Sequence, residues 1–275
     1  MAGNPLQQYF RQPKIYIKLP TSGIYSPPGT VQGDINSLPV YGMSGMDEII
    51  MKTPDALLSG ESVVKIIQSC CPSITNAWAL SSLDTEMILT AIRIATYGNK
   101  SNVDHTCPKC NTENSYDIDL GFIIEHFAKA NYQNNLVLKD FVIKTQPLNY
   151  KINTEFGLRN FKVQQQLRQV ADLDDQEKQK EVVAQLFEEL AKIQLDIFTE
   201  MIESVEFNNT VVNQKPYIKE WLENCDKDVY DRLKEQITQN KLIWEVPVVK
   251  VKCEECDSEN SIKMDMDYAN FFANA

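Results

Sequence analysis

The spacing of apolar and polar residues changes several times along the 275-residue chain. Residues 1–45 are rich in proline and glycine, a density of helix breakers that few long helices tolerate. Short runs of alternating character interrupt them, the clearest over residues 14–19. We therefore expect an extended N-terminal arm that contains short strands.

From residue 46 the apolar positions recur at helical spacing. One apolar face follows Gly60, and a second ends at Tyr97 and Gly98, where glycine suits a left-handed helix end. These faces contain Val63, Val64, Ile66, Ile67, Cys70 and Cys71, and Met87, Ile88, Ala91, Ile92 and Ala95. The pattern predicts a helical domain over residues 46–104, with Cys70 and Cys71 as small buried apolar residues.

Residues 121–244 predict a mainly helical segment. Helical periodicity covers residues 121–130, 154–171, 176–204, 219–225 and 229–239. The acidic run at residues 172–175 separates the two longest helices and caps the second. Residues 136–144 favour a strand or hairpin, and residues 205–212 favour a hairpin with Asn208 and Asn209 in its turn.

Four of the seven cysteines form two C-x-x-C pairs, Cys107 with Cys110 and Cys253 with Cys256. A two-residue turn aims two thiolates at one metal ion, and two such turns complete a tetrahedral four-thiolate zinc site. The sequences that follow the pairs also match, since residues 107–120 and 253–266 are identical at six of fourteen positions. Apolar residues then alternate with polar ones, as in a half-buried strand. The sequence predicts a zinc ribbon built from two arms, residues 105–120 and 245–270.

Other roles for the cysteines remain open at this point. A thioredoxin-like redox pair would need one C-x-x-C between a strand and a helix, and a disulfide could join the arms after oxidation. A catalytic zinc site keeps an open position, which four cysteines do not leave. His105 could replace a ligand but is better explained as a solvated strand residue, and His126 as a residue on a helix face.

If the arms meet, Cys110 and Cys253 lie close together although 142 residues separate them. The expected fold is then α+β: mainly helical, with a split four-cysteine zinc ribbon whose two knuckles flank a large insertion, residues 121–244. We hypothesise that the ion clamps the ends of the insertion, because closing so long a loop is otherwise entropically unfavourable.

Charge and motif content narrow the function. The chain has 27 Lys+Arg against 38 Asp+Glu, a formal net charge of -11 and a pI near 4.8. Such a balance argues against nucleic-acid binding and against attachment to anionic membranes. The sequence contains no long apolar run or signal-peptide core, no phosphate-binding glycine motif and no nucleophile elbow, and it has only two histidines. We expect a binding or assembly protein without a small-molecule substrate.

The order of short motifs resembles the T4-type bacteriophage baseplate protein family, which includes baseplate hub subunits and hub assembly proteins of contractile-tailed phages. The motifs start at residues 19–25 (Leu-Pro-Thr-Ser-Gly-Ile-Tyr) and continue through residues 39–43, 47–50, 53–57, Gly60, residues 83–84 and 92–98, and the Cys107-Pro108 turn. The resemblance covers about residues 15–120 and 245–270, and the insertion matches only loosely.

The resemblance implies a non-enzymatic protein that helps to build the hub of a contractile tail. Its partners would be other hub and tail proteins. It would act in the host cytoplasm during assembly, and either stay in the virion baseplate or leave as an assembly factor. The competing hypotheses are a zinc-ribbon adaptor in transcription or nucleic-acid handling, which would need a basic patch, and an unrecognised hydrolase.

Overall fold

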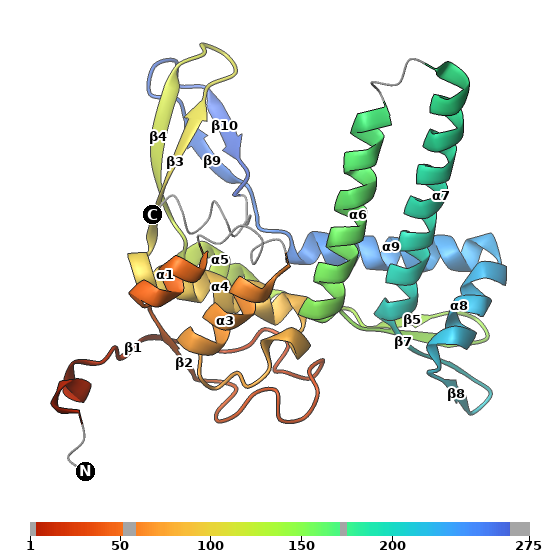
Figure 1. Cartoon of the computed structure of the whole chain (residues 1–275), viewed down its shortest axis with the longest axis horizontal. Helices are drawn as coiled ribbons and strands as arrows, with labels where there is room; N and C mark the ends of the chain where they lie inside the picture. The colour runs from red at the N-terminus through yellow and green to blue at the C-terminus, as the bar shows by residue number, and fades with distance from the viewer. Residues whose placement is uncertain (1–3, 52–58, 171–174, 265–275) are drawn as a thin grey trace. The chain divides into compact units, whose positions relative to one another are not determined.

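The computed structural model describes residues 4–51, 59–170 and 175–264. The chain divides into two compact units (Figure 1). The first unit comprises residues 1–131 and 244–275, and the second comprises residues 132–243. In sequence, the second unit is therefore an insertion within the first. Helices and antiparallel sheets make up both units, which confirms the α+β class.

The first unit begins with a short 3-10 helix, η1 (Pro5–Tyr9), and a two-stranded antiparallel sheet of β1 (Pro13–Ile17) and β2 (Leu38–Tyr41). The residues described after β2 form the helices α1 (Gly45–Met51), α3 (Glu61–Cys70) and α4 (Ser82–Tyr97), with the short 3-10 helix η2 (Ala77–Ala79) between the last two. Most residues of α4 are themselves buried, so this helix lies at the centre of the core of the first unit. The core includes Leu19, Leu38, Val40, Ile66, Ile67, Cys70, Cys71, Ile88 and Ile92, all without exposed surface.

The arm packs on this helical core through residues 13–41. Thr21 donates from its backbone N–H to the Asp84 carboxylate at 3.0 Å, and its hydroxyl donates to the same group. Asp84 is fully buried, and Ser81 caps α4 beside it by accepting from the Asp84 N–H at 3.1 Å. Burial raises the pKa of Asp84, and the hydrogen bonds from Thr21 and Ser81 act against that rise. A buried carboxyl thus fastens the arm to the start of the central helix.

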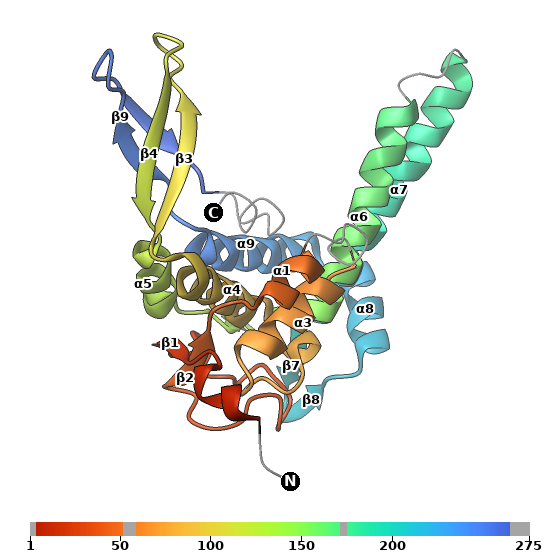
Figure 2. The same ribbon diagram turned by 60° about the vertical axis from the view of Figure 1, so that its left-hand side comes forward.

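Two β-hairpins complete the first unit. β3 (Lys100–Thr106) pairs with β4 (Glu113–Asp119), and β9 (Val249–Lys252) pairs with β10 (Glu259–Ile262), each as a separate antiparallel sheet. Figure 2 shows the hairpins side by side, although more than a hundred residues of chain separate them. Helix α5 (Gly121–Lys129) follows β4, and its Phe127 stacks on Trp244, with 6.0 Å between ring centroids.

The second unit joins a helical hairpin to a small sheet. α6 (Tyr150–Val170) and α7 (Gln176–Met201) form the hairpin, and α8 (Lys215–Asn224) and α9 (Lys227–Trp244) follow. The sheet order is β5 (Asn135–Val137), β6 (Val142–Thr145), β7 (Ile202–Phe207) and β8 (Thr210–Val212), antiparallel throughout. One core lies along α6 and α7, with Val163, Val170, Leu186 and Ile193 buried. A second is centred on Ile143, Phe198, Ile202, Ile218 and Leu233.

Two side chains of α9 join the ends of the inserted unit, since Gln236 donates to the Gln133 carbonyl at 2.8 Å and Asn240 also binds Gln133. Asn240 on α9 accepts from the Gln133 N–H at 2.8 Å and donates to the Gln133 carbonyl at the same distance. In the first unit, the Phe127–Trp244 stack is a further contact between residues close to the two chain crossings.

Several elements differ from the sequence prediction. β3 begins at Lys100, within residues that were predicted as part of the helical domain 46–104. Its side chains alternate between exposed and half-buried, but few of them are apolar, so the sequence pattern did not indicate a strand. α7 stops at Met201, short of residue 204, and the chain continues directly into β7. α8 and α9 are longer than predicted. Residues 171–174 of the predicted break, and Met266, lie outside the described residues, and Asp175 caps α7 as expected.

No helix of the described part of the chain combines the length and the apolar character that crossing a membrane requires.

Candidate metal centre

Each C-x-x-C pair forms the turn of one hairpin, and the two turns have the same backbone structure. The Cys107 N–H donates to the Thr112 carbonyl and the Asn111 N–H to the Cys107 carbonyl, both at 2.9 Å. In the other hairpin the Cys253 N–H donates to Ser258 and the Asp257 N–H to Cys253, both at 3.0 Å. These turns, residues 107–112 and 253–258, are the knuckles of the predicted ribbon.

Both knuckles need one residue with positive φ. Asn111 has φ 58° and Asp257 has φ 53°, each directly after the second cysteine of its pair. Asparagine and aspartate tolerate this left-handed conformation better than other residues with a side chain. The sequence repeat therefore encodes the turn geometry as well as the thiols.

The two knuckles bring their thiols together. The Sγ atoms of Cys107 and Cys256 are 3.8 Å apart, and those of Cys110 and Cys253 are 3.5 Å apart. All four sulfurs lie within 4.8 Å of one another. The first cysteine of each pair is buried and the second is half-buried. The predicted meeting of the remote arms is present in the structure.

The separations fit a tetrahedral thiolate site. With four sulfurs about 2.3 Å from one zinc ion, each tetrahedral edge is about 3.8 Å. Sulfurs joined by a disulfide would be about 2.05 Å apart, and all seven cysteines are free thiols. Each pair also lies between two antiparallel strands, whereas a thioredoxin-like pair stands between a strand and a helix. The arrangement therefore favours a metal over either alternative.

Polar groups next to the cluster favour the thiolate form of Cys107. The Ser258 hydroxyl lies 3.2 Å from the Cys107 sulfur and 3.1 Å from the Cys256 sulfur. Hydrogen bonds from Ser258 and from the backbone N–H of Cys110 lower the pKa of Cys107 to about 5. A thiol that ionises this readily is ready to ligate a metal ion near neutral pH.

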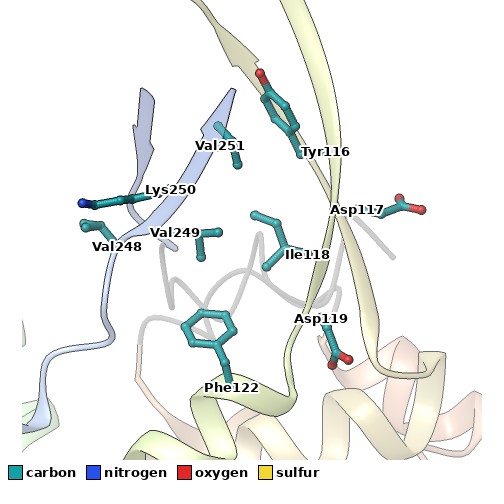
Figure 3. Close-up of a pocket in the computed structure, with 9 residues that line it drawn as sticks. All are labelled: Tyr116, Asp117, Ile118, Asp119, Phe122, Val248, Val249, Lys250 and Val251. Atoms are coloured by element: carbon teal, nitrogen blue, oxygen red, sulfur yellow. The ribbon is translucent and has the colours of Figure 1, made fainter. Parts of the chain in front are cut away.

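The hairpins enclose an apolar cleft below the knuckles, of about 490 Å³ (Figure 3). Ile118 and Phe122 face Val249 and Val251 across it, whereas charged side chains on its walls, such as Asp117, point away. The Tyr116 hydroxyl donates to the Lys252 carbonyl at 2.9 Å and so joins β4 to β9. The cleft interior is therefore mainly apolar.

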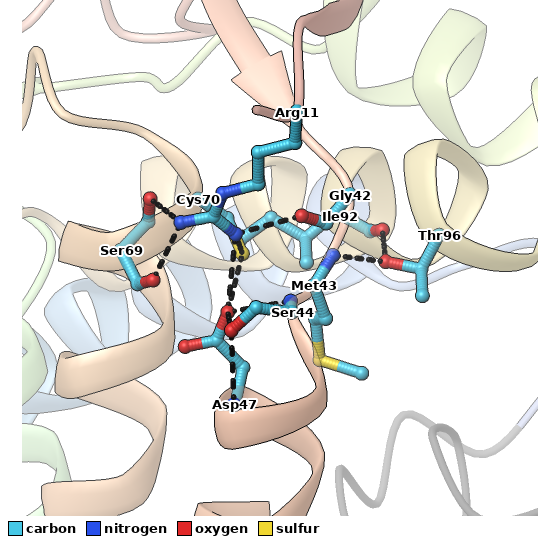
Figure 4. Close-up of polar contacts among 9 residues, drawn as sticks. All are labelled: Arg11, Gly42, Met43, Ser44, Asp47, Ser69, Cys70, Ile92 and Thr96. Carbon is cyan, nitrogen blue, oxygen red and sulfur yellow. Dashed lines mark hydrogen bonds and ion pairs between the residues drawn. The ribbon is translucent and has the colours of Figure 1, made fainter. Parts of the chain in front are cut away.

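A separate cluster anchors the start of the arm (Figure 4). The Arg11 guanidinium donates to the Gly42 carbonyl at 2.8 Å, to the Ser69 carbonyl at 2.7 Å and to Asp47 at 3.1 Å. Burial raises the pKa of Asp47, but hydrogen bonds from Ser44 and Ser69 and the charge of Arg11 outweigh it, so the pKa lies below its ordinary value. Arg11 therefore pins the chain just after η1.

The other candidate residues play no part in the cluster. Burial raises the pKa of Cys70 to about 12 and that of Cys71 to about 11, as expected for packed apolar thiols. His105 is half-buried on β3, and the group that could hold a metal ion among the described residues consists of cysteines alone. Sequence reasoning missed Ser258, Asn114 and Asn260, although all three lie in the repeated segment.

The fold and the site define a class: an α+β protein in which two C-x-x-C hairpins flank an inserted unit and bring four thiols together. A family model described as T4 bacteriophage base plate protein matches residues 46–273. Since the match covers most of the chain, the protein belongs to this family, and the resemblance seen in its motifs is confirmed. Neither a curated protein nor a solved structure matches the chain.

Proposed function

We propose that this baseplate protein is a non-catalytic structural or assembly component of the hub of a contractile phage tail, with a structural zinc ion held by Cys107, Cys110, Cys253 and Cys256. The family match carries the baseplate assignment. The convergence of four thiols from remote parts of the chain supports the ion. The location in the hub, the identity of the metal as zinc and the lack of catalysis are the parts of the proposal that go beyond these two observations.

Zinc is the metal that the donor set favours. Four thiolates in a compact tetrahedral group are typical of structural zinc, and they leave no position for a substrate or a reactive water. The ion would contribute folding free energy, because the site cannot exist in the unfolded chain. Its role would be to hold together the two hairpins that precede and follow the insertion in the sequence.

The N-terminal segment is the part of the arm that we propose for contact with other hub or tail proteins. Residues 4–10 are exposed, and Leu6, Tyr9 and Phe10 present 62%, 77% and 56% of their surface to solvent. Arg11 fixes the point where this segment leaves the core. An anchored, exposed apolar segment is suited to docking on a neighbour during assembly in the host cytoplasm and in the virion tail.

Complementation of a phage that lacks the gene tests the proposal. Wild-type protein supplied in the host should restore complete baseplates, counted by electron microscopy, and infectious particles. Mass spectrometry of purified virions then distinguishes a retained component from an assembly factor. Normal baseplates in the absence of the protein would contradict a role in hub assembly.

The adaptor alternative predicts a different result. A nucleic-acid protein would be retained on heparin at low salt through a basic surface. The knuckles and adjoining strands carry Glu113, Glu254, Glu255, Asp257 and Glu259, so we expect the protein to flow through. Retention that salt reverses would favour the adaptor.

A further inference from the structure

The two hairpins are related by a shift of 146 residues, which superimposes Cys107 on Cys253 and Asn114 on Asn260. Each asparagine is the second residue of the strand that leaves its knuckle. Asn114 is 5% exposed and Asn260 is 7% exposed. Two buried amides at equivalent positions beside one thiol cluster call for a reason, since buried polar groups are costly unless they are hydrogen-bonded.

Asn114 reaches across to the opposite knuckle. Its Nδ2 lies 3.5 Å from the Cys253 sulfur and donates to the Thr112 carbonyl at 3.0 Å. Its Oδ1 accepts from the Glu254 N–H at 3.0 Å. One side chain thus holds its own turn, the backbone of the other turn and a sulfur of the other pair.

Asn260 has the mirrored position but not the mirrored contacts. The residue that corresponds to Glu254 is Pro108, which has no N–H to donate to the Asn260 carbonyl. The Asn260 Nδ2 is buried and has no hydrogen-bond partner. By the same shift of 146 residues, the Cys107 sulfur is the equivalent of the Cys253 sulfur that Asn114 approaches.

A thiolate that ligates a metal is a far better acceptor than a neutral thiol, since hydrogen bonds to charged groups are stronger. Groups that donate to metal ligands fix the ligand position and are known to alter metal affinity about 10–100-fold. The Asn260 Nδ2 is a buried donor without a hydrogen-bond partner. In the metal-bound state, the Cys107 thiolate would be an acceptor for it.

We propose that Asn114 and Asn260 are positioning residues that cross-brace the metal centre, each donating from one hairpin to the first cysteine of the other. Pro108 makes the pair unequal, so that Asn114 bears most of the bracing. The proposal rests on metal binding by the four cysteines and assigns a second layer of residues to that site.

The test compares zinc release from the full-length protein to a chromogenic chelator. Asn114→Ala should release zinc roughly 10-fold or more faster than wild type, and Asn260→Ala less than that. Asn102→Ala is the matched control, because Asn102 lies on the same hairpin but is exposed. Equal rates for Asn114→Ala and Asn102→Ala would overturn the proposal, whereas a wild-type protein that binds no metal would overturn the metal site itself.

Two further measurements separate positioning from general stability. In the cobalt-substituted protein, loss of the hydrogen bond to Cys253 should move the thiolate-to-cobalt charge-transfer band to longer wavelength, since the sulfur electrons are held less tightly. Pro108→Ala restores the missing N–H and should slow zinc release, but not when combined with Asn260→Ala. A charge-transfer band that does not move in Asn114→Ala would contradict the bracing. So would an equal effect of Pro108→Ala on zinc release in the wild-type and Asn260→Ala proteins. Because the two tests use different variants, one of them remains informative if a variant folds poorly.

Discussion

At the scale of single residues, Asp196 shows how the second unit uses charge. It accepts from Arg159 at 2.9 Å and from Lys219 at 2.7 Å, and Arg159 also donates to Glu189 at 3.0 Å. Burial raises the pKa of Asp196, but the hydrogen bonds from Lys219 and Arg159 outweigh it and leave the pKa below 3.8. The network joins α6, α7 and α8 through one carboxylate.

Asp196→Asn should lower the free energy of unfolding by about 1 kcal/mol at pH 7, since the pairs are only partly buried. Because the folded pKa is lowered, this stabilisation is present above the ordinary pKa and is lost as the pH falls through the folded pKa. The difference between the variant and wild type in urea unfolding should therefore shrink below about pH 4. Glu188→Gln, which breaks an exposed pair with Lys192 on the same helix, is the control with little expected effect. A constant difference from pH 7 to pH 3 would contradict the assignment.

The residues of the candidate metal centre could be predicted from the sequence to different extents. C-x-x-C spacing and the repeat around it are enough to predict the four cysteines, because thiol geometry is fixed by a short local turn. Asn114 and Asn260 carry no hydrophobic or spacing signal, and their importance appears only when the two hairpins are placed together. Their identity at equivalent positions of the repeat was the available hint.

At the scale of elements, the end of α7 illustrates what periodicity does not show. Apolar residues continue at helical spacing past Met201, and no glycine or proline marks the stop. Where the helix ends, Lys215, from the start of α8, donates to the carbonyls of Thr199, Glu200 and Ile202 at 3.0, 2.9 and 2.8 Å. The Gln146 N–H also donates to the Met201 carbonyl, at 2.8 Å. A long-range cap of this kind satisfies carbonyls that the helix cannot, and local sequence does not reveal it.

Lys215→Met should destabilise the second unit by about 2–3 kcal/mol, because several carbonyls at the end of α7 lose a charged donor. Faster hydrogen exchange at the amides of α7 and β7 would report the change. Lys227→Met is the matched control, since Lys227 is largely exposed at the start of α9 and pairs with Asp231 of its own helix. Similar exchange in both variants would argue against the cap.

Among the elements, the helical hairpin was the easiest to predict from the sequence, and the attachment of the arm was the hardest. α6 and α7 follow from sustained apolar periodicity, and each is found within a few residues of its predicted bounds. The strands of the arm were expected, but its attachment through Thr21 and Arg11 depends on distant partners, Asp84 and Asp47, which no local pattern identifies.

At the scale of the whole molecule, the four cysteines join hairpins on either side of the insertion. Cys253→Ser combined with Cys256→Ser should abolish zinc binding and lower the thermal unfolding midpoint, since the ion would otherwise contribute folding free energy and close a long loop. We expect the loss mainly in the first unit, because both hairpins belong to it, whereas Asn240 and the Phe127–Trp244 stack provide further contacts near the ends of the insertion. A double variant that melts with wild type in calorimetry would contradict the clamp. Cys225→Ser, at a half-buried thiol of the second unit, is the control.

The most direct measurement is X-ray absorption at the zinc K-edge of the purified full-length protein. The account predicts four sulfur neighbours at about 2.3 Å from a single zinc ion per chain. A shell that contains nitrogen or oxygen ligands, fewer than four sulfurs, or no bound zinc would contradict it.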